Sequence, residues 1–139
     1  MKNTKTVPQF LVRIFVRPFF PFFQWLVITL GIIKAPTKRG NFLVGKLKEG
    51  VDHEKARETL EQQGFFANRI AHNEPGQVLS MRRLSVKNPE WQYHIRVFND
   101  GEIRGHCEVT PSDHPIDHLN LSTMEHRPHD FAKWIKDIT

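Results

Sequence analysis

The residues best suited to chemistry gather in one stretch, 113–130, with the sequence DHPIDHLNLSTMEHRPHD. It holds four of the chain's eight histidines and four of its fifteen carboxylates, and both groups are common zinc ligands. His114 and His118 have the i, i+4 spacing that lets two imidazoles bind one ion from a helix, but Pro115 disfavours helical angles at His114. We therefore predict a polar loop that binds no metal, and no cofactor. The remaining alternative is a loop-built site of His118, His126 and His129 with an acidic residue.

A second set of polar residues follows from a predicted β-hairpin over residues 90–110. The alternating pattern turns at Asn99-Asp100-Gly101, and a three-residue loop with Gly101 in the left-handed conformation places all the apolar residues on one face. On this apolar face Tyr93 lies opposite Cys107. The other face then pairs Gln92 with Glu108, His94 with His106 and Arg96 with Arg104.

The predicted ligand-binding site on this face consists of its histidines and arginines, namely His94, Arg96, Arg104 and His106. Directly opposed imidazoles, with Cβ atoms about 4.5–5.5 Å apart, can share a metal ion or a proton. The arginine pair beside them can take a carboxylate or a phosphate. We expect this face to be exposed, which would make His106→Ala nearly neutral for stability. Cys107 points into the core, so a Cys/His nucleophile is not expected.

The elements that position these residues are readable from local signals. Asp52 is a helix N-cap and Gly64 suits the C-terminal cap, which predicts a helix over 53–63. Pro128 and the apolar residues that follow it predict a final helix. The predicted strands outside the hairpin cover 41–47, 65–71 and 78–86.

This order predicts a two-layer α+β domain over 40–139, a largely antiparallel sheet with helices on one face, preceded by an N-terminal hydrophobic helical anchor. The full sequence has 139 residues and is 39% hydrophobic, which allows one hydrophobic core. Residues 1–39 form the basic, aromatic-rich segment and linker. A single cysteine excludes an intramolecular disulfide.

Charge is divided unevenly along the chain. The first 48 residues carry nine basic side chains and no acidic one, whereas residues 49–139 carry 11 basic and 15 acidic side chains. A nucleic-acid-binding protein needs its positive charge on the folded domain, so no nucleic-acid partner is expected.

Residues 9–33 contain seven of the fifteen aromatic residues and only two charges, which indicates an attachment to membrane lipids. A helix of about 19–33 is expected after a break at Pro18, and it is shorter than the hydrocarbon core. This segment could either span the membrane or lie in the interface. Basic residues flank it on both sides, so the sequence does not predict its orientation. A cleaved signal peptide, a mitochondrial presequence and helices packed on the domain or on a partner are the alternatives.

The sequence favours a membrane-attached, non-enzymatic module whose exposed sheet face binds a protein or an anionic ligand. One alternative is a small metal-dependent or hydrolase-like enzyme that uses His94 and His106 with the 113–130 loop. Another is an accessory subunit of a membrane complex.

Overall fold

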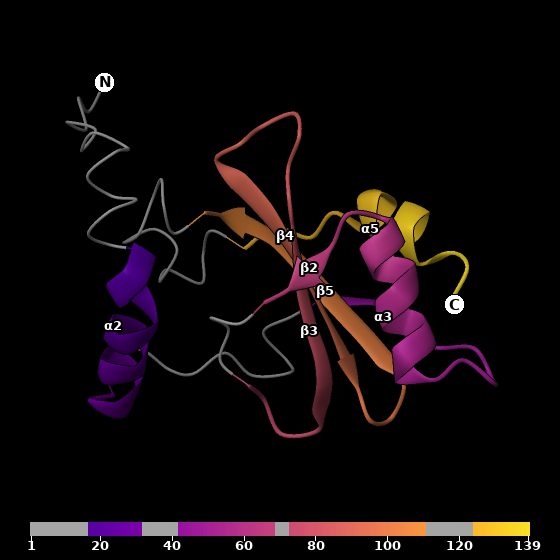
Figure 1. The fold of residues 1–139 in the computed structure, drawn as a ribbon, viewed down its shortest axis with the longest axis horizontal. Coiled ribbons are helices and arrows are strands. Elements are labelled where there is room, and N and C mark those ends of the chain that lie inside the picture. The colour runs from indigo at the N-terminus through magenta and orange to yellow at the C-terminus, as the bar shows by residue number, and fades with distance from the viewer. Residues whose placement is uncertain (1–16, 32–41, 69–72, 111–123) are drawn as a thin grey trace.

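The protein is an α+β domain built on a five-stranded antiparallel sheet with the strand order β1-β5-β4-β3-β2 (Figure 1). The computed structural model describes residues 17–31, 42–68, 73–110 and 124–139. Its strands are β1 (Phe42–Lys46), β2 (Phe66–Ala67), β3 (Gln77–Leu84), β4 (Trp91–Phe98) and β5 (Glu102–Val109). Its helices are α2 (Arg17–Thr29), α3 (His53–Gln62) and α5 (Pro128–Ile135). The predicted α+β class with an antiparallel sheet and the predicted order of elements after residue 40 are confirmed.

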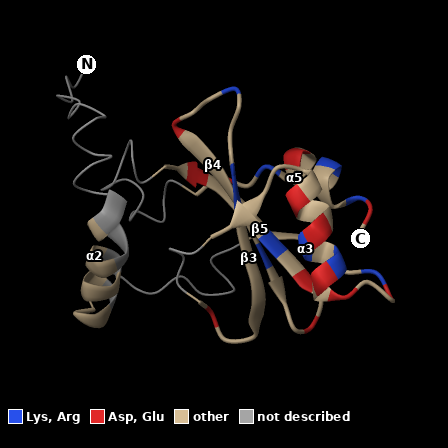
Figure 2. Ribbon diagram, in the orientation of Figure 1, with Lys and Arg blue, Asp and Glu red and all other residues tan. Residues whose placement is uncertain are grey.

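Helix α3 begins and ends where its capping residues predict. The Asp52 side chain accepts a hydrogen bond of 2.8 Å from the backbone N–H of Lys55. At the other end Gly64 has a φ of +84°, and the N–H of Phe65 donates to the carbonyl of Leu60, which is the Schellman arrangement. The charged residues of α3, coloured along its ribbon in Figure 2, are exposed except for the half-buried Arg57.

The β4–β5 hairpin has the predicted register. Tyr93 lies opposite Cys107, His94 opposite His106, and Arg96 opposite Arg104. The chain turns at Asn99-Asp100-Gly101, where Gly101 has a φ of +81° and donates its N–H to the carbonyl of Phe98. A side chain at this φ would be strained, so the glycine fixes the loop length and, with it, the residues on each face.

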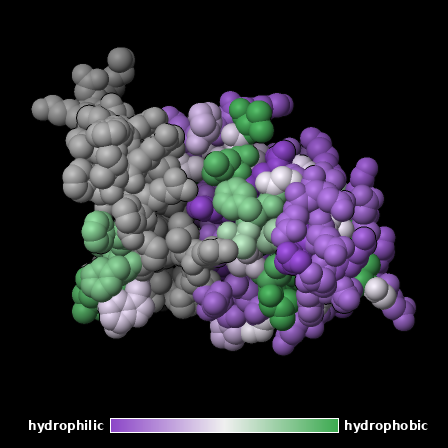
Figure 3. Space-filling model, in the orientation of Figure 1, coloured by the Kyte–Doolittle hydropathy of each residue, from purple (hydrophilic) through white to green (hydrophobic). Residues whose placement is uncertain are grey.

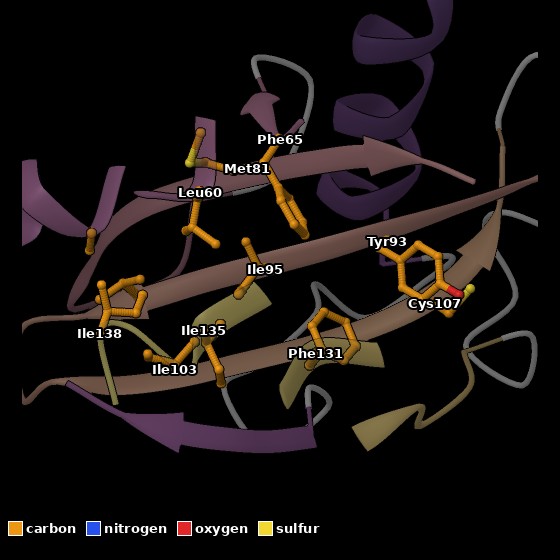
Figure 4. Packing of buried hydrophobic residues seen from close by; sticks show 12 residues of the cluster. Leu60, Phe65, Met81, Tyr93, Ile95, Ile103, Cys107, Phe131, Ile135 and Ile138 are labelled. Atoms are coloured by element: carbon orange, nitrogen blue, oxygen red, sulfur yellow. The ribbon is translucent and has the colours of Figure 1, made fainter. Parts of the chain in front are cut away.

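The core lies between the sheet and the pair α3 and α5 (Figure 4). Side chains of Leu60 from α3 and Phe131 and Ile135 from α5 pack against Ile95 and Ile103 of the hairpin. Gly105 permits this approach, since an added Cβ would lie 2.7 Å from the Phe131 ring and 2.9 Å from a backbone oxygen. Both helices therefore cover the same face of the sheet.

Two predicted elements differ in extent. Strand β2 has only two residues where a strand over 65–71 was expected, and residues 69–72 lie outside the described part of the chain. Helix α2 begins at Arg17, two residues before the expected start, so no break separates Arg17 from Pro18. Proline is tolerated there because the first turn of a helix has no partner for the missing N–H.

Helix α2 stands apart from α3 and α5, across the sheet from them (Figure 1). Its length of 13 residues corresponds to about 20 Å at 1.5 Å per residue. Among the residues that the structure describes, no helix is both long and apolar enough to cross a membrane. The residues that the structure describes therefore do not support the predicted N-terminal hydrophobic anchor.

Candidate functional site

The face of the hairpin turned away from α3 and α5 carries a layer of polar side chains, which we call the polar layer. Strand alternation places Gln92, His94 and Arg96 of β4 on it, together with Arg104, His106 and Glu108 of β5. The layer is buried. His94 is 6% exposed, His106 1% and Glu108 3%, and of the six only Arg104 is half-buried.

Burial corrects the prediction of an exposed binding face. The register placed the four predicted residues on one face, and that part is right. The expectation of exposure came from the default for an antiparallel sheet with helices on one side, whose second face usually meets water. In this protein His94, Arg96 and His106 are almost completely removed from solvent. A partner cannot dock directly on these side chains in this conformation.

His94, His106 and Glu108 form a compact group at the centre of the layer. The two imidazole rings are stacked, with centroids 5.1 Å apart and planes 19° apart. Each oxygen of the Glu108 carboxylate approaches a different ring. Oε1 lies 2.9 Å from His94 Nε2, and Oε2 lies 3.2 Å from His106 Nε2.

The charge of Glu108 is maintained by these imidazoles. Burial alone would raise the pKa of the carboxyl group, because desolvation disfavours the charged form. The interactions with His94 and His106 outweigh burial and hold the pKa of Glu108 well below its usual range. Glu108 is therefore a carboxylate at neutral pH, although it is almost fully buried.

The two arginines each have an acidic partner. Arg96 makes a buried hydrogen-bonded ion pair with Glu74, and Arg104 Nε lies 2.8 Å from Glu102 Oε2. Burial lowers the pKa of Arg96, and the charge of Glu74 opposes this shift. The predicted anion-binding pair is thus already neutralised within the chain, so an incoming carboxylate or phosphate would have to displace Glu74 or Glu102.

Two amide side chains complete the surroundings of the group. The Asn68 amide nitrogen lies 2.9 Å from His94 Nδ1. Gln92 is 1% exposed and pairs with Glu108 across the hairpin. Neither amide atom of Gln92 has a hydrogen-bond partner in the described structure, and Asn68 Oδ1 lacks one as well. Buried polar atoms without partners are rare and call for an explanation.

Of the alternative ligand set, only His126 and His129 belong to the described residues. His118 lies outside the described residues, as do 111–123 in general. His126 and His129 are exposed, and the His126 ring stacks on Phe42 with centroids 4.5 Å apart. Within the described ranges, His94, His106 and Glu108 are the one group of three or more His, Cys, Asp or Glu residues close enough to share an ion, with ligand atoms within 4.8 Å of one another.

Cys107 is an apolar core residue, as predicted. It is fully buried, and burial raises the pKa of its thiol to about 12. The thiol therefore stays protonated at neutral pH, and a protonated thiol is a poor nucleophile.

The sequence reasoning missed three members of the site. The alternation already predicted Glu108 on this face, opposite Gln92, but Glu108 was not among the predicted site residues. Glu74 lies in the connection before β3, and Asn68 lies just after β2, and neither position carries a sequence pattern that points to the hairpin. Long-range pairing of loop residues is a product of the tertiary fold.

Comparisons of this chain with protein-family models, with curated proteins and with solved structures found no match. The class that the structure itself defines is an α+β domain with a buried cluster of two histidines and a glutamate, preceded by a short apolar helix. Function must be argued from these two features.

Proposed function

We propose that this protein is a membrane-attached module, held at the bilayer surface by α2 and the basic segments around it. Its α+β domain would then stand at the membrane surface. The lipid-facing part is not the polar layer but the apolar surface of α2.

The observation that carries the proposal is the exposure of α2. Four aromatic residues and a leucine of this region are exposed to solvent, and the exposed fraction of their side chains ranges from 47% to 64%. They are Phe19, Phe22, Phe23, Trp25 and Leu30. In Figure 3 most of the described side chains at the position of this helix in Figure 1 are green, which marks hydrophobic residues. Contiguous exposed apolar surface of this kind marks a site of membrane or protein interaction.

Charge favours a lipid surface as the partner. The sequence carries no Asp or Glu before Glu49, and nine Lys and Arg residues precede that position. Figure 2 shows no acidic residue on α2. Each basic residue near an anionic leaflet contributes about 1 kcal/mol, and aromatic side chains prefer the headgroup region.

The length of α2 favours a position in the interface over a spanning one. About 20 Å of helix is shorter than a hydrocarbon core of about 30 Å. A helix that lies in the plane of the interface needs only one apolar surface and can keep its termini among the headgroups. We therefore propose interfacial attachment by α2.

The alternative of an enzyme is less well supported. A hydrolytic site needs access for substrate and water, and His94 and His106 are nearly inaccessible. The same burial removes support from a protein-binding role of the polar layer. An accessory subunit that buries α2 in a larger complex is the remaining competitor, and it shares the same exposed helix.

Co-sedimentation of the full chain with lipid vesicles tests the proposal. We expect binding to vesicles that contain phosphatidylserine and weaker binding to pure phosphatidylcholine, because the basic segments lose their partner there. The double substitution Phe22→Ser and Trp25→Ser should reduce binding at least tenfold. Val86→Ser is the matched control, since Val86 is an 87% exposed apolar residue outside α2.

Two outcomes would contradict membrane attachment. One is a full chain that stays in the supernatant with anionic vesicles, which would favour a protein partner for α2. The other is equal loss of binding in the Val86 control, which would show that α2 is not specifically involved.

A further inference from the structure

We propose that His94, His106 and Glu108 form a binding site for a divalent transition metal, with Zn²⁺ as the ion that the ligand set suits best. This inference is independent of membrane attachment. It assigns a role to the polar layer, which the proposed function leaves without one.

The geometry of the three side chains supports the assignment. Their ligand atoms all lie within 4.8 Å of one another, and the two measured nitrogen-to-oxygen distances are 2.9 and 3.2 Å. In a tetrahedral zinc site with bonds of about 2.0–2.1 Å, neighbouring ligand atoms lie roughly 3.3 Å apart. The two nitrogen-to-oxygen distances, each to a different oxygen of Glu108, are close to this separation.

The chemistry of the donors fits the same ion. Two imidazole nitrogens and one carboxylate are a set that zinc accepts in proteins, whereas magnesium and calcium prefer oxygen alone. The side chains come from adjacent strands of one hairpin, whose register is fixed by the glycine turn at Gly101. A rigid sheet holds ligands more accurately than a loop does.

Gln92 supplies the second, independent observation. Its amide is 1% exposed, lies across from Glu108 on the same face, and has no hydrogen-bond partner for either of its polar atoms in the described structure. A buried amide left in this state costs free energy. A metal ion held beside Glu108 would give this amide a partner. The amide oxygen would be the fourth ligand of the ion, or the amide would form a hydrogen bond with a metal-bound water.

Asn68 is suited to orient His94 for the ion. Histidines that bind metal through Nε2 usually donate their Nδ1–H to an oxygen. Asn68 now places its nitrogen 2.9 Å from His94 Nδ1, while its own Oδ1 is left without a partner. A 180° flip of the Asn68 amide places Oδ1 at this position. Oδ1 then accepts a hydrogen bond from the Nδ1–H of His94, and the lone pair of His94 Nε2 is left for the metal.

The neighbouring cations have contacts with other groups, although the charge of Arg96 also interacts with Glu108. Arg96 has its ion pair with Glu74, and the guanidinium of Arg82 lies over the Phe66 ring, 4.9 Å from its centroid. Both oxygens of Glu108 face the imidazoles instead.

Burial indicates what the ion does. A closed site of this kind resembles structural metal sites, which contribute directly to folding, more than catalytic ones, which keep an open position for substrate. The ion would connect β4 and β5 directly, and through Asn68 it would also engage the residue that follows β2. We therefore assign it a stabilising role.

The test is metal analysis of the purified full chain, loaded with Zn²⁺ and then freed of excess metal. We expect one zinc per chain, at least a tenfold loss of affinity in Glu108→Gln and in His106→Gln, and a loss of about tenfold in Asn68→Ala. His129→Ala is the matched control because His129 is an exposed histidine outside the group. It also tests the alternative site of His118, His126 and His129.

X-ray absorption of the zinc-loaded wild-type chain provides a readout that does not depend on variants folding. Two imidazole ligands with oxygen ligands would support the site. A wild-type chain that is folded and takes up no zinc would overturn it. So would a Glu108→Gln chain that keeps its zinc, or a His129→Ala chain that loses it.

Discussion

The two faces of the β4–β5 hairpin are both buried, yet they are built on different principles. On the side of α3 and α5, residues such as Ile95, Ile103 and Cys107 gain stability from contact area, which requires no particular partner. On the other side, His94, His106 and Glu108 depend on one another and on specific neighbours. The apolar face tolerates many residues of the right size, whereas each polar residue has few acceptable replacements.

The largest effect should come from breaking the apolar face with a charge. Cys107→Asp places a carboxylate among core residues, and the neighbouring Arg127 already pairs with Glu125, so the change should cost several kcal/mol and unfold a domain of ordinary stability. Chemical denaturation followed by circular dichroism measures the change. Cys107→Val, which keeps an apolar residue of similar size, serves as the control and should change stability by less than about 1.5 kcal/mol. An intact Cys107→Asp domain would contradict the register.

The next effect should come from removing one member of a buried ion pair. Arg96→Met leaves Glu74 buried without its cation, and we expect a loss of about 3–5 kcal/mol in the free energy of unfolding. The double substitution Arg96→Met and Glu74→Leu should recover much of this loss, because no charge is then buried alone. A double variant less stable than the single one would show that the polar layer depends on more than pairing.

Burial also changes the expectation for His106. An exposed His106 could be replaced by alanine at little cost, but at 1% exposure the substitution removes a partner of Glu108 and leaves a cavity. We expect His106→Ala to cost roughly 2–3 kcal/mol by equilibrium denaturation. A change of less than about 0.5 kcal/mol would mean that this face is more open in solution than the structure has it.

A smaller effect should come from the turn that aligns the two faces. Gly101 has a φ of +81°, so Gly101→Val should lower stability by about 1 kcal/mol or more. Gly101→Asn should cost less, because asparagine tolerates this conformation better. Equal losses for the two variants in the same denaturation experiment would argue against a conformational cause.

The smallest effect concerns pH at the edge of the apolar face. The Tyr93 hydroxyl donates a 2.8 Å hydrogen bond to Asp130 Oδ2, and this bond lowers the pKa of Asp130. A carboxyl group with a lowered pKa stabilises the fold above its unfolded pKa of about 3.9, and this stabilisation is lost as the pH falls through the folded value. Tyr93→Phe should therefore be less stable than wild type at pH 7, by an amount that shrinks below about pH 4. A constant difference would contradict the coupling.

The same contrast explains how much could be predicted from the sequence. The register of the hairpin, the caps of α3 and the position of α5 follow from local patterns, because alternation, Asp52, Gly64 and Pro128 act on their own neighbours. The pairing of His94 with His106 was predicted for that reason. The ion pair of Arg96 with Glu74 and the contact of Asn68 with His94 join residues more than 20 positions apart, and no local pattern indicates them.

Burial of the polar layer was the main property that could not be predicted. Alternation shows which residues share a face, but it does not show whether that face meets solvent. The expectation of an exposed face rested on the common behaviour of antiparallel sheets. Gln92 illustrates the difference, because a glutamine in a strand usually indicates a solvent-facing position, and here it is 1% exposed.

The measurement that tests the central claim most directly is thermal unfolding of the full chain with Zn²⁺ and with a chelator. An ion bound only by the folded state at 100 times its dissociation constant adds about 2.7 kcal/mol of stability, which corresponds to an increase of several degrees in the unfolding midpoint. We predict this increase for the wild-type chain and for His129→Ala, and none for Glu108→Gln. A wild-type midpoint that is the same with zinc and with chelator would contradict the assignment of the polar layer as a metal site.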